Sequence, residues 1–311
     1  MPRHKTSRHI HTTLHNHVFQ HPHFIFASRT TACERHIERN EDSILVDKLG
    51  GLVAVFDGVG GSAAGEIASQ TAAHATLQEW RQMLDRQQHG RRIPTFLEPC
   101  EKIDLCSSLE HIIQEADELV RTEGARRAGT SDLATTVALA AFCRTSEAGE
   151  YHMIYAHVGD SRIYLLQQGK PLQRLTSDDG LLAKLVENQI ISDKDALRID
   201  QAMHADELSD IELSYFKLRG GITQALGGPL APTIHTDQIS IHPGDRILLC
   251  TDGIHDNLTD REIEAVLRDS PRTASARMLV ERSLYRSHED RGTNIRAKPD
   301  DMSAIVITCC F

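Results

Sequence analysis

The chain has 311 residues, 40% of them hydrophobic, which suits one large domain or two small ones with a sizeable core. Its formal net charge of −10 argues against a nucleic-acid partner, because a nucleic-acid-binding surface needs a basic face. No apolar run reaches about 18 residues, so we expect no membrane-spanning helix and no membrane partner.

The first 22 residues differ in composition from the rest of the chain. Seven of the 18 histidines fall within the first 23 residues, among polar and basic neighbours. The segment lacks the apolar core of a secretory signal, and its polarity predicts a disordered tail. A histidine-rich tract could also bind metal ions unspecifically. We therefore divide the chain into a tail, 1–22, and one domain, 23–311.

The seven cysteines include no CxxC pair, and their number is odd. Three of them lie inside apolar, strand-like runs. We interpret them as small buried side chains in a reducing compartment, and we expect a cytoplasmic protein.

Strands come first along the chain and helices follow. Apolar runs rich in β-branched and aromatic residues predict strands at 23–31, 43–48 and 51–58. Apolar residues at helical spacing then predict helices over 64–84 and 109–124.

Strands return in the middle of the chain. Apolar runs predict them at 135–144, 151–160 and 161–169. The stretch 178–221 is polar and rich in aspartate, and we expect short helices in a surface insertion there. The stretch 238–253 is predicted to be a hairpin that turns at a Pro-Gly pair.

The C-terminal part predicts two helices, around 260–268 and 273–287, and a closing strand over 303–311. The whole order is strands, two helices, strands, two helices, strand. Such an order is typical of an α+β fold with antiparallel sheets and helices segregated outside them.

Acidic residues stand at the termini of five expected strands: Asp57, Asp160 and Asp252 at strand ends, and the pairs Glu41–Asp42 and Asp300–Asp301 before strand starts. A single Asp-Gly pair is usually a turn. Carboxylates gathered at one end of a sheet, however, repel one another unless a cation lies between them. Oxygen ligands without a nearby His/Cys pattern indicate Mg²⁺ or Mn²⁺. Two such ions about 4 Å apart activate water and hold a phosphoryl group.

Eight segments carry a resemblance to a known family: RNED, VFDGVGGSAAGEIAS, GTSDLATTVALA, VGDSRIYLL, LTSDD, ITQALGG, LLCTDGIHDNLTDREI and PDDMSAIVI. In this order, over roughly residues 23–311, they resemble the motifs of the metal-dependent (PPM, type 2C) serine/threonine protein phosphatases. The DGVGG form resembles the bacterial branch. The resemblance implies a β-sandwich of two antiparallel sheets flanked by pairs of helices, with a dinuclear metal site at one end.

The resemblance also implies roles for individual residues. Asp57 matches the aspartate that bridges both ions, and Gly58 the glycine whose carbonyl oxygen binds one of them. The remaining matches are Asp252 and Asp300 as direct ligands, Glu41 and Asp42 as holders of metal-bound water, and Asp160 as the aspartate that, with Asp252, can take a third ion. Asp57, Asp252, Glu41 and Asp42 are thus the expected catalytic residues.

The implied activity is hydrolysis of phosphoserine and phosphothreonine in proteins by a metal-activated water, without a covalent intermediate. The implied partners are phosphorylated substrates of a serine/threonine kinase, and we expect a monomer. Two alternatives stay open: an inactive scaffold of the same fold that binds phosphoproteins, and a hydrolase of nucleotides or other small phosphoesters.

The phosphate-binding arginine departs from the family's pattern. The family places it four residues before the glutamate of the NED triplet, where this chain has Ile37 between Arg35 and Arg39. If 35–39 is extended, all three side chains share a face. We favour Arg39 as the phosphate ligand because it is closer to Glu41. The alternative is that Arg39 only neutralises the acidic cluster.

Smaller features also bear on the site. Val59 stands where some relatives carry a histidine proton donor, and Asp301 stands where asparagine is usual. We expect Asp301 to face solvent, the alternative being that it raises metal affinity. Gly60 and Gly61 are expected to leave room for a phosphoprotein. The insertion 178–221 falls where the family carries a variable flap.

Overall fold

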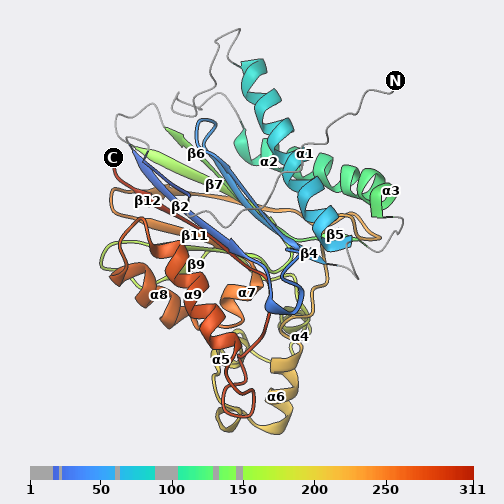
Figure 1. Ribbon diagram of the computed structural model, residues 1–311, viewed down its shortest axis with the longest axis vertical. Helices are drawn as coiled ribbons and strands as arrows, with labels where there is room; N and C mark the ends of the chain where they lie inside the picture. The colour runs from blue at the N-terminus through green and yellow to red at the C-terminus, as the bar shows by residue number, and fades with distance from the viewer. Residues whose placement is uncertain (1–16, 21–22, 60–63, 88–103, 129–132, 145–149) are drawn as a thin grey trace, which may run out of the picture.

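The computed structural model describes residues 17–20, 23–59, 64–87, 104–128, 133–144 and 150–311. Two β-sheets pack face to face, and helices cover the outer face of each (Figure 1). The predicted α+β sandwich is therefore confirmed. None of the helices in these ranges is long and apolar enough to cross a membrane.

Both sheets are antiparallel throughout. The first consists, in spatial order, of β1 (His17–Gln20), β2 (Phe24–Thr31), β12 (Met302–Cys309), β11 (Arg246–Cys250), β8 (Arg162–Leu166) and β9 (Gln173–Arg174). The second consists of β10 (His235–Ile241), β7 (Tyr151–Val158), β6 (Val137–Arg144), β4 (Leu52–Val59) and β3 (Asp42–Asp47), with β5 (Ala134–Thr135) paired to β4.

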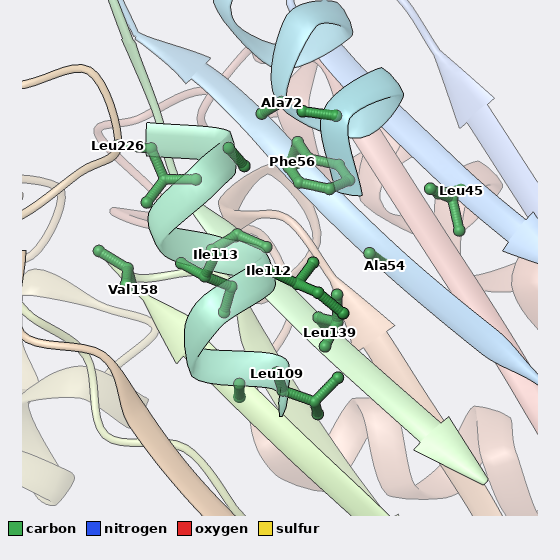
Figure 2. Packing of buried hydrophobic residues seen from close by; sticks show 14 of the residues in the cluster. Leu45, Ala54, Phe56, Ala72, Leu109, Ile112, Ile113, Leu139, Val158 and Leu226 are labelled. Carbon is green, nitrogen blue, oxygen red and sulfur yellow. The ribbon is translucent and has the colours of Figure 1, made fainter. Parts of the chain in front are cut away.

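Two helices cover the second sheet: α1 (Ala64–Gln87) and α2 (Leu105–Leu119). A π-helical turn (Val120–Gly124) and the short α3 (Ala125–Ala128) follow α2. Figure 2 shows Leu109, Ile112 and Ile113 of α2 in one apolar cluster with Phe56 and Leu139 of the sheet. The helix begins before the predicted position 109, because a preceding aspartate at 104 caps it by accepting a backbone N–H.

The helices α7 (Asp252–His255), α8 (Asp260–Asp269) and α9 (Ser275–Ser287) cover the first sheet. A capping box starts α8: the Thr259 hydroxyl accepts the N–H of Glu262, and the Glu262 carboxylate accepts the N–H of Thr259. This cap fixes where α8 begins.

The central strands are buried on both faces, which explains their nearly unbroken apolar sequences. In β4, Leu52, Ala54 and Phe56 face α1 and α2, whereas Val53 and Val55 face the other sheet. Successive side chains of a strand point to opposite faces, so a strand covered on both sides is apolar at every position. The apolar run of β4 can end only where the strand leaves the sandwich, and Asp57 stands at that point.

The insertion 178–221 contains the expected short helices, α4 (Leu181–Glu187), α5 (Asp193–Gln201) and α6 (Asp210–Lys217), with a 3₁₀ turn at Ala205–Glu207. They lie together beyond one end of the sandwich, at the bottom of Figure 1. Ile199, Ala202 and Phe216 form a small apolar cluster of their own.

Two expectations about the strands are wrong. Residues 17–20 of the expected disordered tail form β1, which pairs with β2, because an edge strand offers unpaired backbone groups to a neighbour. The rest of the tail lies outside the described residues. The stretch 238–253 is not a hairpin, since β10 pairs with β7 while β11 pairs with β8 and β12. The turn at Gly244 (φ 90°) therefore carries the chain from one sheet to the other.

Candidate active site

The strand ends bring the predicted acidic residues together. Asp42 of β3 lies directly opposite Asp57 of β4 in the antiparallel register. The Thr251 hydroxyl, which follows β11 in the other sheet, donates to Asp42 Oδ2 at 2.8 Å. Asp252 comes next and begins α7. Because the two sheets meet here, residues 42, 57 and 252 converge from distant parts of the sequence.

Mutual repulsion marks this cluster electrostatically. The pKa of Asp57 is raised well above its usual range, first by burial and then by the carboxylates of Asp252, Asp42, Asp300 and Asp160. The pKa of Asp160 is raised for the same reasons, with burial first and Asp252 next. These charges gain stability when a cation lies among them.

Asp160, the residue predicted to take a third ion, is also buried. The Asp160 side chain is 4% exposed, and its backbone carbonyl contacts His255 Nε2 at 3.0 Å. The preceding Gly159 donates its N–H to Asp179 at the start of the insertion. One edge of the cluster is therefore fixed by residues of α7 and of the insertion.

Close packing of β4 against α1 requires glycine at position 58, independently of any role in metal binding. A Cβ atom there would lie 2.1 Å from the carbonyl oxygen of Gly65 and 2.6 Å from that of Glu41. The Gly58 N–H also donates to the Glu41 carbonyl at 3.0 Å. A side chain would push β4 away from α1, which would displace Asp57. Gly60 and Gly61 lie outside the described residues, and Val59, the last residue of β4, is partly exposed.

Asp301 does not face solvent, so that expectation is wrong. It is 4% exposed, and its two oxygens accept the backbone N–H groups of Cys33 and Glu41 at 2.6 Å each. A carboxylate at this position can be buried because it satisfies two donors at once. Asp301 thus holds Glu41 in place at the start of β3.

The segment with the candidate arginines is not extended, as the prediction assumed. Glu34–His36 forms a 3₁₀ turn, and Ile37 follows with helical dihedral angles and a 70% exposed side chain. Arg39 Nη2 lies 3.3 Å from Glu41 Oε1, whereas Arg35 is exposed. The shared-face argument fails, but the structure still places Arg39 beside the acidic cluster.

Lys298 is the residue that the sequence analysis missed. Its Nζ lies 2.5 Å from Asp252 Oδ2, 2.8 Å from Asp256 Oδ2 and 2.9 Å from Asp300 Oδ2. Burial would lower the pKa of Lys298, but these three carboxylates outweigh burial and hold it well above its usual range. The signal was a lysine two residues before Asp300, directly before the last acidic motif.

Asp256 also went unnoticed in the sequence. Its Oδ1 contacts Arg219 Nη2 at 3.0 Å, and its Oδ2 contacts Lys298. Burial would raise the pKa of Asp256, yet Arg219 and Lys298 lower it well below its usual range. Arg219 lies near the C-terminal end of the insertion. The two ion pairs of Asp256 therefore link the insertion to the carboxylate cluster.

The donor set suits a hard divalent cation, because it consists of carboxylate oxygens and backbone carbonyls. Within the described ranges, no three His, Cys, Asp or Glu side chains are arranged as a metal cage. Around Asp252 and Asp300 the ammonium of Lys298 takes the central position instead. The chemistry of the residues fits a metal ion, and a cation is already part of the arrangement.

Comparison with known proteins identifies the family of the chain. The family profile described as "Protein phosphatase 2C" matches residues 29–287. The chain belongs to this family.

Curated relatives include serine/threonine protein phosphatase PstP of Mycobacterium tuberculosis, 29% identical over 259 residues, which are 83% of this chain and 42% of PstP. Serine/threonine phosphatase Stp of Listeria monocytogenes is 27% identical over 224 residues, which are 72% of this chain and 74% of Stp. The match with PstP thus spans less than half of that protein.

The fold is shared with solved structures. A crystal structure of M. tuberculosis PstP matches with a TM-score of 0.68 at 25% identity, covering 93% of this chain and 100% of that one. The PstP catalytic domain in complex with 2 manganese ions matches with a TM-score of 0.65 at 26% identity, covering 93% and 99%.

Proposed function

We propose that this chain hydrolyses phosphoserine and phosphothreonine in proteins and depends on a divalent metal. The observation that carries the proposal is the buried cluster around Asp57, whose carboxylates repel one another, in a chain of the protein phosphatase 2C family. Relatives named serine/threonine phosphatases support the substrate class.

The proposed cofactor is Mg²⁺ or Mn²⁺, two ions per chain, with a third at Asp160. Asp57, Asp252 and Asp300 would hold the ions with their carboxylates, and Gly58 with its carbonyl oxygen. Bound cations of this kind acidify a water molecule and neutralise charge on the phosphoryl group. The two-manganese complex of PstP supports the choice of ion.

Glu41 and Asp42 would orient the attacking water and receive its proton. Burial raises the pKa of Glu41, with Arg39 opposing, and burial raises the pKa of Asp42 well above its usual range, with Asp301 adding to it. A raised pKa makes a carboxylate a stronger base, which suits a group that receives a proton. Arg39, 3.3 Å from Glu41, would bind the phosphate through its planar fork of donors.

The insertion 178–221 would select the protein substrate. A groove of about 710 Å³ runs between its helices, lined by Ile190, Ile191, Ile211 and Tyr215 with Asp193 and Asp195 at its polar side. The base of the insertion adjoins the site, since Asp179 binds the backbone next to Asp160. We further propose kinase substrates as partners, a monomeric state and a cytoplasmic location.

The test is phosphate release from a phosphothreonine peptide by the purified chain, with and without Mn²⁺, and after chelation. We expect turnover that needs added metal and disappears in chelator. A nucleotide panel run in parallel separates a general phosphoester hydrolase from a protein phosphatase. Metal-loaded protein that binds the phosphopeptide but releases no phosphate would establish the scaffold alternative instead.

A further inference from the structure

Lys298 occupies the place where a cation would meet the carboxylates of the proposed metal site. Its Nζ contacts one oxygen each of Asp252, Asp256 and Asp300, all within 2.9 Å. Two of these three carboxylates are proposed metal ligands. A divalent ion held by Asp252 and Asp300 would therefore stand in the position of the ammonium or next to it.

We propose that Lys298 is a built-in counter-ion: it neutralises Asp252 and Asp300 while no divalent ion is bound, and it withdraws from them when the ion binds. The inference rests on the proposed function, because it takes Asp252 and Asp300 as metal ligands. It makes metal affinity a balance between two cations that compete for the same oxygens.

Lys298 is suited to leave, unlike the other cations nearby. Its side chain is 31% exposed, so part of the side chain already borders water. Arg219 is only 6% exposed and Arg296 is fully buried, where it donates to backbone carbonyls. These arginines are fixed parts of the fold, whereas a lysine on a flexible four-carbon stem can change partners.

Asp256 is the carboxylate with which Lys298 can stay paired when a metal ion is bound. It contacts Lys298 at 2.8 Å and is anchored by Arg219 at 3.0 Å, and it is not among the proposed ligands. A metal ion would take Asp252 and Asp300, and Lys298 would remain paired with Asp256. The backbone of Gly220 also borders this pair, since a Cβ there would lie 3.7 Å from Nζ and 3.9 Å from Asp256 Oδ2. A shift of Lys298 on metal binding would therefore change the surroundings of Gly220, at the end of the insertion.

The effect on stability and affinity follows from electrostatics. Without a metal, removing the ammonium leaves buried like charges uncompensated, which destabilises the fold. With a metal, the ion no longer has to displace the ammonium. The lysine therefore stabilises the metal-free protein and weakens metal binding.

The experiment compares wild type with Lys298→Met, both freed of metal by chelation and then titrated with MnCl₂ by calorimetry. We expect the variant to bind Mn²⁺ at least 10-fold more tightly. We also expect its metal-free Tm to fall by several degrees and the rise in Tm on adding Mn²⁺ to be larger than for wild type. Lys184→Met is the matched control, because Lys184 pairs only with exposed Glu187 in the insertion and should change neither quantity.

A measurement on wild type covers the case in which Lys298→Met does not fold. Reductive methylation with ¹³C-formaldehyde labels the lysine amines, and the NMR signal of Lys298, assigned with Lys298→Arg, is followed during a Mg²⁺ titration. We expect its shift and its reactivity to change with metal, while the signal of Lys184 does not.

The outcomes separate the inference from the proposed function. Equal or weaker Mn²⁺ binding by Lys298→Met, or a Lys298 signal that ignores a bound metal, would overturn the counter-ion role and leave a purely structural ion pair. No Mn²⁺ binding by either protein would instead overturn the metal site on which the proposed function depends.

Discussion

The carboxylates at the end of the sandwich and those of the insertion 178–221 are the same chemical groups in opposite environments. In the first region the pKa of Asp57 is raised by burial and by four neighbouring carboxylates. In the second the pKa of Glu212 is lowered to about 2, first by the Ser209 backbone N–H and also by Arg198. Glu212 belongs to the capping box that starts α6, where its side chain is partly exposed, whereas Asp57 lies in a cluster short of positive charge.

The difference separates carboxylates that stabilise local structure, such as Glu212, from carboxylates that can bind a ligand, such as Asp57. A carboxylate that caps a helix already has its donors, so it has little left to offer a ligand. A buried carboxylate facing other carboxylates gains from any cation that arrives. The changes below test whether the two regions differ in the way that this contrast requires.

Asp57→Asn should have the largest effect. We expect kcat for a phosphothreonine peptide to fall at least about 1,000-fold, equivalent to about 4 kcal/mol, because the central carboxylate is lost. The metal-free Tm should stay the same or rise, because one of the repelling charges is gone. Circular dichroism and steady-state kinetics measure the two effects.

Asp252→Asn is the informative companion to that change. It should be equally inactive, but its metal-free Tm should not rise, since Asp252 is paired with Lys298 at 2.5 Å. Retention of more than a tenth of wild-type turnover by Asp57→Asn would contradict the assignment of this cluster as the active site.

A buried histidine near the start of the insertion, His157, predicts that the stability of the protein depends on pH. His157 is buried and stacked on His235, which contacts Asp179 of the insertion at 3.0 Å. Burial, and then His235, lowers the pKa of His157 to about 4. An unfolded histidine has a pKa of about 6.5, so between pH 6.5 and 4 the unfolded state binds more protons.

His157 therefore makes the free energy of unfolding fall as the pH drops through that window, by up to about 3 kcal/mol, and contributes no such loss above it. His157→Gln should flatten this slope in urea denaturation at pH 7, 6 and 5. His111→Gln, at an exposed position on α2, is the control and should keep the wild-type slope. Identical slopes in all three proteins would show that His157 is not held neutral.

Arg39→Ala should weaken kcat/KM for a phosphopeptide by roughly 10- to 100-fold, about 1.4 to 2.7 kcal/mol, because a donor to the phosphate is lost. Arg35→Ala, at an exposed position with no contact to Glu41, should do much less. Kinetics of both variants on one peptide decide the point. A larger loss in Arg35→Ala would move the phosphate site to the other arginine, and no loss in either would leave phosphate binding to the metals.

Asp193→Asn should have the smallest effect, because the residue lies in the exposed groove and away from the carboxylate cluster. We expect a change of a few-fold in kcat/KM between phosphoprotein substrates, under about 1 kcal/mol, and less than 2-fold on an aryl phosphate. Asp206→Asn, outside the groove, is the control. Equal changes on both substrate types would make the insertion a structural element.

Much of the fold could be predicted from the sequence, because a strand that is buried on both faces has an unbroken apolar sequence. The apolar runs of β4 and β12 and the helical spacing of α2 and α9 follow from which faces are covered. The carboxylates at strand ends were visible for the same reason, because a charged residue ends an apolar strand only where the strand leaves the core. The short helices of the insertion followed from its polar composition.

Sheet membership was not open to prediction. Ile239 and Ile241 of β10 and Ile247 and Leu249 of β11 all face the inter-sheet core, although the two strands belong to different sheets. Alternation tells which face of a strand is buried and not which strand lies beside it. β1 was missed because pairing with the edge of β2 depends on backbone groups and not on composition.

The partners of the charged residues were decided by tertiary structure alone. The sequence places Lys298 near Asp300 but far from Asp252 and Asp256, and only the meeting of α7 with the segment before β12 brings the four together. Asp301 stands beside a predicted ligand, yet it is occupied by the N–H groups of Cys33 and Glu41. A sequence fixes which residues are charged, whereas the energy of a charge depends on burial and on neighbours that only the folded chain supplies.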